Sequence, residues 1–326
     1  MKKRRGILYC LLAASMLVSL TGCSKGGSGT HLLVAHSHNE NHPVHVGLTY
    51  MKDEMEKNTG YTFSIYPNGQ LGGNSDMIQM VKAGVLDVAK VSASSLEQFN
   101  PAYSIFSLPY VFQSTEHYFK VMEESRAVQE IFKSTYDQGF FAVGRYDSGA
   151  RSVYTTKEGP VESPADLKGL KIRTQDSPTS IEMIRNMGGA ATPMSSGEVY
   201  TSLQQGIIDG AENNETVLVD DGHGEVAKSY TYTQHQYTPD IVIISTKTWE
   251  SMSEQDRAMD ESFWKHEEKW QEIVERNIQG AKELGVQFYE IHKTPFIQAV
   301  KSQHDAFCAE SGDNAGYLAD FLSYAE

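Results

Sequence analysis

Short apolar segments and helix-like segments alternate along the first third of the chain. Residues 31–35 are apolar enough for a strand, and residues 44–57 carry apolar side chains at helical spacing. Residues 61–66 alternate between apolar and polar, a helical pattern follows at 74–84, and an apolar run follows at 85–89. Strands that alternate with helices are typical of a parallel sheet covered by helices on both faces, so we predict an α/β fold.

A second block of the same kind begins near residue 140. Two such blocks predict two α/β lobes, and ligands of open α/β sheets bind where the loops gather at the carboxyl ends of the strands. The residues that follow each strand are therefore the candidates for a binding site. The predicted elements are strands at 140–144, 170–174 and 207–208, helices at 177–187 and 196–205, and a long helical stretch at 253–284.

The first 22 residues have the pattern of an export signal. A basic head at 2–5 precedes a short apolar run at 7–20, which is too short to span a bilayer comfortably. The junction Leu20–Cys23 resembles a bacterial lipobox, in which the cysteine receives the lipid. We predict a signal peptide at 1–22, lipidation of Cys23, a flexible tether at 23–30 and an extracytoplasmic location, with an uncleaved N-terminal anchor as the alternative.

The composition restricts which partners the protein can bind and how its fold can be stabilised. The 326 residues suffice for a large core in two lobes, and the formal net charge of −14 argues against nucleic acid and anionic lipid as partners. Removal of the basic signal would make the remaining chain still more acidic. If Cys10 leaves with the signal and Cys23 carries lipid, only Cys308 remains, so no internal disulfide can form and the core must stabilise the fold.

Three polar side chains lie at the predicted strand ends of the second block. Arg173 sits within an apolar strand, Arg151 lies about twenty residues earlier, and Asn213 follows the third strand. The planar guanidinium of arginine meets both oxygens of a carboxylate at once, which suits an anion-binding role. The alternative for Arg173 is an ordinary solvent-facing position on its strand.

Four separated motifs, in order, resemble the TRAP-transporter solute receptors of the DctP type. The resemblance runs from about residue 32 to beyond residue 270. The motif at 165–173 carries most of it, because it matches the DLKGLKIR signature of that family. The four segments are Tyr66–Gly72, Phe106–Tyr110, Ala165–Arg173 and Met194–Asn213.

The resemblance implies a monomeric, two-lobed periplasmic-binding-protein-like fold with a ligand cleft between the lobes and a long helix that spans the hinge. It also implies a receptor that binds without catalysis or cofactor and delivers its ligand to the membrane subunits of a TRAP importer. On this basis the first lobe comprises 31–148 and about 239–278, and the second comprises 149–238 and about 279–326.

The resemblance also assigns roles to individual residues. The signature arginine of the family falls on Arg173, which would pair with a ligand carboxylate. A second, more variable arginine falls on Arg151. The asparagine of the family falls on Asn213, which would bind the same carboxylate.

The far end of the ligand should meet the first lobe. Short neutral or weakly basic side chains follow its strands and suit hydroxyl groups, and no second cationic clamp is evident. This pattern favours a monocarboxylate sugar acid, a hexuronate or aldonate, over the alternatives of a C4-dicarboxylate, a keto acid or sialic acid. The candidates are His36, His38, Asn39, Ser92 and Ser94, with Glu215 of the other lobe as a hydroxyl acceptor.

The sequence gives weaker support to two other functions, zinc capture and glycoside hydrolysis. Five histidines crowd into 31–45, and zinc capture by an exported lipoprotein is the remote alternative, although no cysteine joins them and no His-Glu-x-x-His pattern is present. A glycosidase would use paired carboxylates such as Glu212 and Glu215. Those carboxylates would repel a carboxylate ligand, so we predict no catalytic residues and no metal site.

Overall fold

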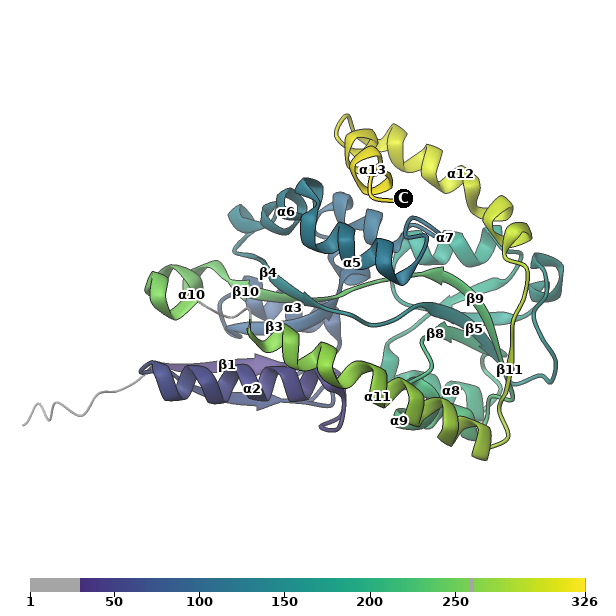
Figure 1. Cartoon of the computed structure of the whole chain (residues 1–326), viewed down its shortest axis with the longest axis horizontal. Helices are drawn as coiled ribbons and strands as arrows, with labels where there is room; N and C mark the ends of the chain where they lie inside the picture. Colours follow the sequence, from purple (N-terminus) through teal and green to yellow (C-terminus); the bar gives the residue numbers. More distant parts are fainter. Residues whose placement is uncertain (1–29, 258–260, 326) are drawn as a thin grey trace, which may run out of the picture.

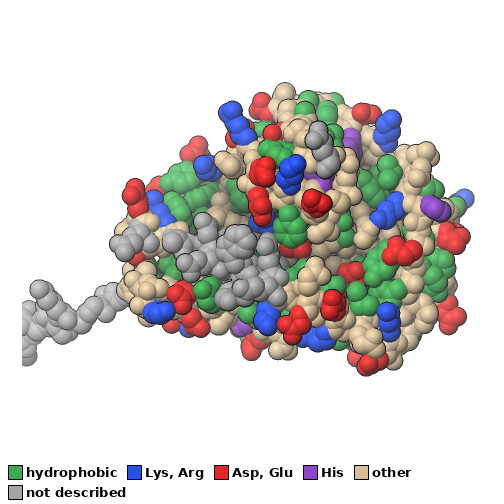
Figure 2. All heavy atoms as spheres, in the orientation of Figure 1, with side chains coloured by type: hydrophobic (Ala, Val, Ile, Leu, Met, Phe, Trp, Pro, Cys, Tyr) green, Lys and Arg blue, Asp and Glu red, His purple; other side chains and the backbone are tan. Residues whose placement is uncertain are grey.

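The computed structural model describes residues 30–257 and 261–325. The predictions for the signal peptide at 1–22, the lipidated Cys23 and nearly all of the tether fall outside these residues. Among the residues that the structure describes, no helix combines the length and apolar character that a membrane span requires. On the face shown in Figure 2, acidic side chains are scattered between apolar and basic ones rather than gathered in one area.

The first lobe is built on a five-stranded mixed sheet with the strand order β2-β1-β3-β10-β4. β1 runs parallel to β2 and β3, as the alternation of strand and helix predicts, whereas β10 runs antiparallel to β3 and β4. Both faces are covered by apolar side chains, as expected for buried parallel strands. The strands are β1 His31–Ala35, β2 Thr62–Tyr66, β3 Val88–Ser92, β4 Phe140–Tyr146 and β10 Asp240–Ser245.

Local sequence explains where the first long helix begins. The side chain of His42 accepts a hydrogen bond from the backbone of Val44, and Pro43 occupies the first turn, where its missing N–H costs nothing. The helices of this lobe are α2 Pro43–Asn58, α3 Asn74–Lys82, α4 Ala93–Leu96, α5 Thr115–Glu124, α6 Arg126–Lys133 and α10 Thr246–Ser251, with 3-10 turns η1 Pro101–Ser107, η2 Tyr136–Gln138 and η6 Glu254–Arg257.

The second lobe contains a six-stranded mixed sheet with the order β11-β9-β5-β8-β6-β7. β6 is parallel to β7 and β8, and β5 pairs antiparallel with β8 and β9. Its strands are β5 Arg151–Thr155, β6 Lys171–Thr174, β7 Ala190–Pro193, β8 Gly210–Asn213, β9 Ser229–Gln236 and β11 Gln287–Tyr289. Its helices are α7 Pro178–Asn186, α8 Val199–Gln204 and α9 Val217–Asp220, with 3-10 turns η3 Pro164–Leu167, η4 Ser196–Glu198 and η5 His223–Glu225.

The chain passes between the lobes in extended segments and along one long helix. Residues 147–150 lead from β4 into β5, and residues 237–239 lead from β9 into β10. The helix α11 (Glu261–Glu283) contacts α2 of the first lobe and α9 of the second, so it spans both, as Figure 1 shows. The two-lobed α/β architecture with a spanning helix is therefore as predicted.

The C-terminal helices divide between the lobes. α12 (Thr294–Glu310) packs against α7 and β9 of the second lobe, whereas α13 (Asn314–Leu322) packs against α6 and η1 of the first (Figure 1). Phe321 is fully buried in the first lobe's core cluster. Assigning all of 279–326 to the second lobe is therefore wrong for α13, because the apolar face of this helix completes the other core. The remaining lobe boundaries stay a prediction.

Two strands begin three residues later than predicted, for the same reason in each lobe. The apolar residues Val85 and Ile207 are 61% and 49% exposed, because each follows a glycine that ends the preceding helix. The strand starts only after an aspartate whose carboxylate accepts a backbone N–H from the neighbouring strand. Asp87 accepts from Leu33 and Asp209 from Lys171, both at 2.8 Å. β3 is thus 88–92 rather than 85–89, and β8 is 210–213 rather than 207–208.

The pairing of β5 with β8 leaves no room for a side chain at Gly210. A Cβ there would lie 2.4 Å from the Tyr154 carbonyl oxygen and 3.1 Å from the Thr155 Cα, both of them backbone atoms. We expect Gly210→Ala to lower the free energy of unfolding by about 2 kcal/mol, measured by urea denaturation. Gly197→Ala is the matched control, because nothing lies within 4 Å of its Cβ position. Equal stability of the two variants would contradict this packing.

Candidate functional site

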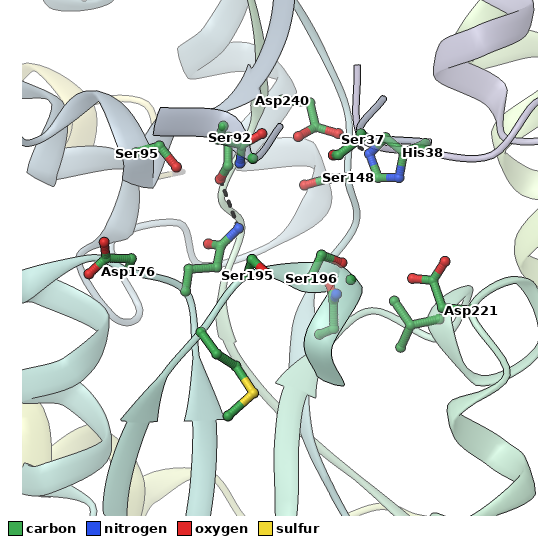
Figure 3. A pocket seen from close by; sticks show the side chains of 18 of the residues that line it. Ser37, His38, Ser92, Ser95, Ser148, Asp176, Ser195, Ser196, Asp221 and Asp240 are labelled. Atoms are coloured by element: carbon green, nitrogen blue, oxygen red, sulfur yellow. Dashed lines mark hydrogen bonds and ion pairs between the residues drawn. The ribbon is translucent and has the colours of Figure 1, made fainter. Parts of the chain in front are cut away.

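A cleft of about 620 Å³ lies between the two sheets and is lined by residues of both lobes. Figure 3 shows side chains from the two walls facing each other across this space. The first-lobe wall includes Ser37, His38, His42, Lys90, Ser92, Ser95, Ser148 and Asp240, and the second-lobe wall includes Arg151, Arg173, Gln175, Met194, Asn213, Asn214 and Asp221. The charged members of the two walls determine what the cleft can hold.

Of the described arginines and lysines that line the cleft, Arg173 is the one without a carboxylate partner. It lies on β6, is only 4% exposed and lines the cleft. Its Nε and Nη2 both donate to the Met194 carbonyl, at 3.1 and 2.8 Å. Among the described residues no carboxylate pairs with it, and burial lowers its pKa. A buried guanidinium satisfied only by a carbonyl retains donors and a charge for an anion in the cleft.

Arg151, by contrast, is already neutralised. Its Nε donates to Glu212 Oε2 at 2.6 Å and its Nη2 to Glu212 Oε1 at 3.0 Å. Although burial alone would raise the pKa of Glu212, the guanidinium outweighs it and lowers that pKa to about 2. His235 Nε2 lies 3.6 Å from the same carboxylate. The cleft therefore contains Arg151 as a fixed ion pair, with one Nη1 proton donated to Asn213 Oδ1 at 2.8 Å.

Asn213 ends β8 and presents an amide to the cleft. Its Oδ1 accepts from Arg151 and from the backbone N–H of Asn214, so its oxygen is occupied from within the protein. Its Nδ2 makes no hydrogen bond with the described part of the chain, which leaves a donor next to Arg151 in the cleft. The orientation of this amide therefore follows from the ion pair behind it.

The first-lobe wall carries a second ion pair. Lys90, on β3, and Asp240, on β10, are 1% and 6% exposed, and Lys90 Nζ lies 3.1 Å from Asp240 Oδ1. His38 Nε2 lies 3.2 Å from Asp240 Oδ2. Burial lowers the pKa of Lys90, whereas the ammonium overcomes burial at Asp240 and holds the pKa of that carboxyl well below its usual range. Within this pair the ammonium and the carboxylate balance each other's charge.

Hydrogen bonds join the walls at one side of the cleft. Gln175, two residues after Arg173, donates to Ser92 Oγ at 3.0 Å and accepts from Ser94 Oγ at 2.9 Å. The dashed line in Figure 3 marks the contact with Ser92. Because Gln175 follows the strand that carries Arg173, the position of Arg173 and the contact between the lobes are connected through β6.

The structure brings some of the sequence-predicted residues together and separates others. Arg173, Arg151, Asn213, Ser92 and His38 line the cleft. The other four, His36, Asn39, Ser94 and Glu215, are not among its lining residues. His36 is fully buried and bonded to His45, Asn39 donates to the Asp220 carbonyl at 3.4 Å, and Glu215 is half-buried beside Tyr232.

Lys90 and Asp240 are two charged cleft residues that the sequence analysis did not propose. Lys90 lies in the apolar run Val88–Ser92, and Asp240 directly precedes four apolar residues of β10. A charged residue within or at the edge of an apolar strand is the same signal that singled out Arg173. Applied to every strand rather than to the second block alone, that signal would have found both residues.

The histidine-rich segment does not converge on a metal position. The rings of His38 and His42 stack with centroids 3.7 Å apart, and His36 Nε2 lies 3.0 Å from His45 Nδ1. Burial, together with nearby His38 and Lys90, lowers the pKa of His36 to about 2, which keeps that ring neutral. In the part of the chain that the structure describes, no group of three or more His, Cys, Asp or Glu side chains is arranged to hold a metal ion.

Comparison with known proteins decides the family. Residues 34–311 match the family model of DctP, described as bacterial extracellular solute-binding protein, family 7. The chain belongs to this family. Within the curated proteins it is 39% identical over 303 residues to the uncharacterised YiiZ of Salmonella typhimurium, covering 90% of this chain and 91% of YiiZ. The 2,3-diketo-L-gulonate-binding periplasmic protein YiaO of Escherichia coli is 26% identical, with coverage of 97% and 98%.

Solved DctP-like structures share the whole fold. A TRAP periplasmic solute-binding protein from Anaerococcus prevotii, with bound D-glucuronate, is 40% identical with a TM-score of 0.88, covering 90% of this chain and 98% of that one. One from Sulfitobacter, with bound β-D-galacturonate, is 29% identical with a TM-score of 0.85, covering 90% and 100%. The fold of this chain is therefore that of TRAP periplasmic solute-binding proteins.

Proposed function

We propose that this protein is the extracytoplasmic receptor of a TRAP-type importer and that it binds a hexuronate in the cleft between its lobes. Arg173 holds the ligand carboxylate through its fork, Asn213 donates to the same group, and Arg151 contributes at most its remaining Nη1 proton. The receptor binds its ligand without chemical change, and the membrane subunits that receive the ligand are separate chains.

The single observation that carries this proposal is the state of Arg173. Burying a guanidinium without a carboxylate partner costs several kcal/mol unless something else compensates, and the Met194 carbonyl compensates only in part. A ligand carboxylate that enters the cleft supplies the missing charge. The resulting charge-assisted bonds contribute about 1.5–3 kcal/mol each.

The balance of charge in the cleft supports a monocarboxylate. Arg151 is neutralised by Glu212 and Lys90 by Asp240, so Arg173 remains as the uncompensated strong cation among the described lining residues. A dicarboxylate would place its second charge against Asp240 or Asp221. Hydroxyl groups instead find serines on the opposite wall. Relatives with bound glucuronate and galacturonate fit the same requirement.

A keto acid of similar size is the second candidate. The relative YiaO is named for binding 2,3-diketo-L-gulonate, which is also a six-carbon monocarboxylate. Arg173 would hold its carboxylate in the same way. A closed pyranose ring presents more hydroxyl donors than the diketo acid, and the serines and ion pairs of the cleft favour the ring.

The N-terminus completes the proposal for location. A lipid on Cys23 would tether the protein, as a monomer, to the outer face of the membrane after removal of residues 1–22. Intact-mass analysis of protein purified from membranes, compared with a Cys23→Ser variant, tests this directly. If the unmodified protein and the Cys23→Ser variant both have the mass of a chain without lipid, Cys23 is not lipidated. The anchoring proposal then fails, while the binding proposal stands.

A thermal-shift panel tests the ligand class. A ligand at 100 times its Kd stabilises the folded state by about 2.7 kcal/mol, enough to move the midpoint by several degrees. We expect D-glucuronate or D-galacturonate to raise the midpoint, and succinate, sialic acid and Zn²⁺ to leave it within error. A shift with succinate alone would replace the hexuronate by a C4-dicarboxylate, and a shift with Zn²⁺ alone would reject the carboxylate receptor.

A further inference from the structure

We propose that Lys90, Asp240 and His38 form the subsite that reads the ring hydroxyls of the ligand farthest from its carboxylate. This inference rests on the proposed function, because it assumes that Arg173 holds the carboxylate on the other wall. Figure 3 shows Asp240 and His38 side by side on the first-lobe wall, opposite Ser195 and Ser196 of the second lobe.

Lys90 has more hydrogen-bond donors than the described residues satisfy, and a donor left unsatisfied in a buried position is costly. Its ammonium carries three N–H donors, and the one ion pair that it forms with the described residues is with Asp240 Oδ1, at 3.1 Å. The side chain is 2% exposed, so bulk water reaches it only through the cleft that it lines. Its remaining donors therefore await acceptors from the cleft.

Asp240 supplies the complementary function. One oxygen accepts from Lys90 and the other from His38, and each carboxylate oxygen has a further lone pair. A hydroxyl group accepts one hydrogen bond and donates another, so it can accept from Lys90 and donate to Asp240 at once. A second carboxylate could not, because it only accepts and would be repelled by Asp240.

His38 fixes the geometry of the carboxylate. Its ring is stacked on His42 with centroids 3.7 Å apart, which restricts the rotation of both rings. Asp240 itself sits opposite Ser92 in the pairing of β10 with β3, so its backbone is held by the sheet. A rigid acceptor with one preferred direction can distinguish an axial from an equatorial hydroxyl, which a flexible surface carboxylate cannot.

The geometry of the sugar ring indicates which hydroxyl group contacts this subsite. In a hexuronate pyranose the carboxylate is attached to C5, and C2 lies directly across the ring. With the carboxylate at Arg173, the 2-hydroxyl is nearest to the opposite wall. D-Mannuronate differs from D-glucuronate at C2 alone, whereas D-galacturonate differs at C4 alone, so the two epimers separate this subsite from the rest of the cleft.

Titration calorimetry with these three sugar acids tests the subsite. We expect the unmodified protein to bind D-glucuronate at least tenfold more tightly than D-mannuronate. Lys90→Met and Asp240→Asn should each reduce this gap to less than threefold, while the ratio between D-glucuronate and D-galacturonate stays unchanged within a factor of two. Lys168→Met, at an exposed position outside the cleft, is the matched control and should alter neither ratio.

The outcomes separate this inference from the proposed function. Equal affinity of the unmodified protein for D-glucuronate and D-mannuronate overturns the subsite without any variant. An unchanged gap in either folded variant, or an equal loss of affinity for all three ligands, does so too, since general damage does not change epimer preference. If one variant fails to fold, the other and the unmodified protein still decide. Absence of all hexuronate binding would reject the proposed function itself.

Discussion

Replacing Arg173 by alanine should lower the affinity for D-glucuronate about 100-fold. The substitution removes two charge-assisted hydrogen bonds to the carboxylate, together worth about 3 kcal/mol or more, and each 1.4 kcal/mol is a factor of ten in Kd. Arg173 has no carboxylate partner among the described residues, so no buried anion is left behind. Removal of this costly buried charge offsets the packing that is lost with the side chain, so we expect the ligand-free midpoint of thermal unfolding to fall by no more than about 2 °C.

Arg173→Lys separates charge from shape at this position. Lysine keeps a positive charge but cannot form two parallel bonds to one carboxylate, so its affinity should lie between those of the alanine variant and the unmodified protein. Titration calorimetry of the three proteins with D-glucuronate gives the order. Unchanged affinity in Arg173→Ala would remove this residue from the site.

Replacing Arg151 by alanine, unlike the substitution of Arg173, should cause a large loss of stability. Glu212 is fully buried and would keep its charge without its partner, which typically costs about 3–5 kcal/mol. Urea denaturation at pH 7 measures this loss. Arg126→Ala is the matched control, because the ion pair of Arg126 with Glu130 is exposed and should contribute less than about 1 kcal/mol.

The pH dependence of this loss of stability tests whether the unpaired Glu212 carboxylate causes it. In the unmodified protein the pKa of Glu212 is held at about 2, so its contribution to stability is complete above the unfolded value near 4.5 and is lost as the pH falls toward 2. In Arg151→Ala burial raises that pKa, and protonation at acidic pH relieves the strain. The stability difference between the two proteins should therefore shrink from pH 7 to pH 3.

A double variant that removes both charges tests the same explanation from the other side. Arg151→Met combined with Glu212→Gln leaves no buried charge and should recover much of the stability at pH 7. A stability difference that does not change with pH, or a double variant as unstable as Arg151→Ala, would mean that the ion pair is not what Arg151 contributes to the fold.

Local patterns in the sequence were sufficient for the first strand and the first two long helices, whereas the helices between β3 and β4 were not predicted. Apolar spacing placed β1, α2 and α3 almost to the residue. The two shifted strands show the limit of such patterns, because Val85 and Ile207 are apolar yet lie on exposed turns. Only the contacts of Asp87 and Asp209 with neighbouring strands reveal where pairing begins, and those contacts depend on tertiary structure.

The candidate site was predictable where one residue carries the signal and not where two distant residues share it. Arg173 stands out because a charge interrupts an apolar strand. Lys90 and Asp240 are 150 positions apart, and no local pattern indicates that β3 and β10 are neighbours. The prediction for His36 did not anticipate that this residue, directly after β1, is fully buried, whereas His38, two residues later, lines the cleft.

The most direct test of the account is a comparison of D-glucuronate with D-glucose by titration calorimetry. The two sugars differ only in the carboxylate at C6, which is the group that Arg173 is proposed to hold. The account predicts binding of one D-glucuronate per chain and no detectable heat with D-glucose at the same concentrations. Comparable binding of both sugars, or of neither, would contradict recognition of a sugar acid by its carboxylate.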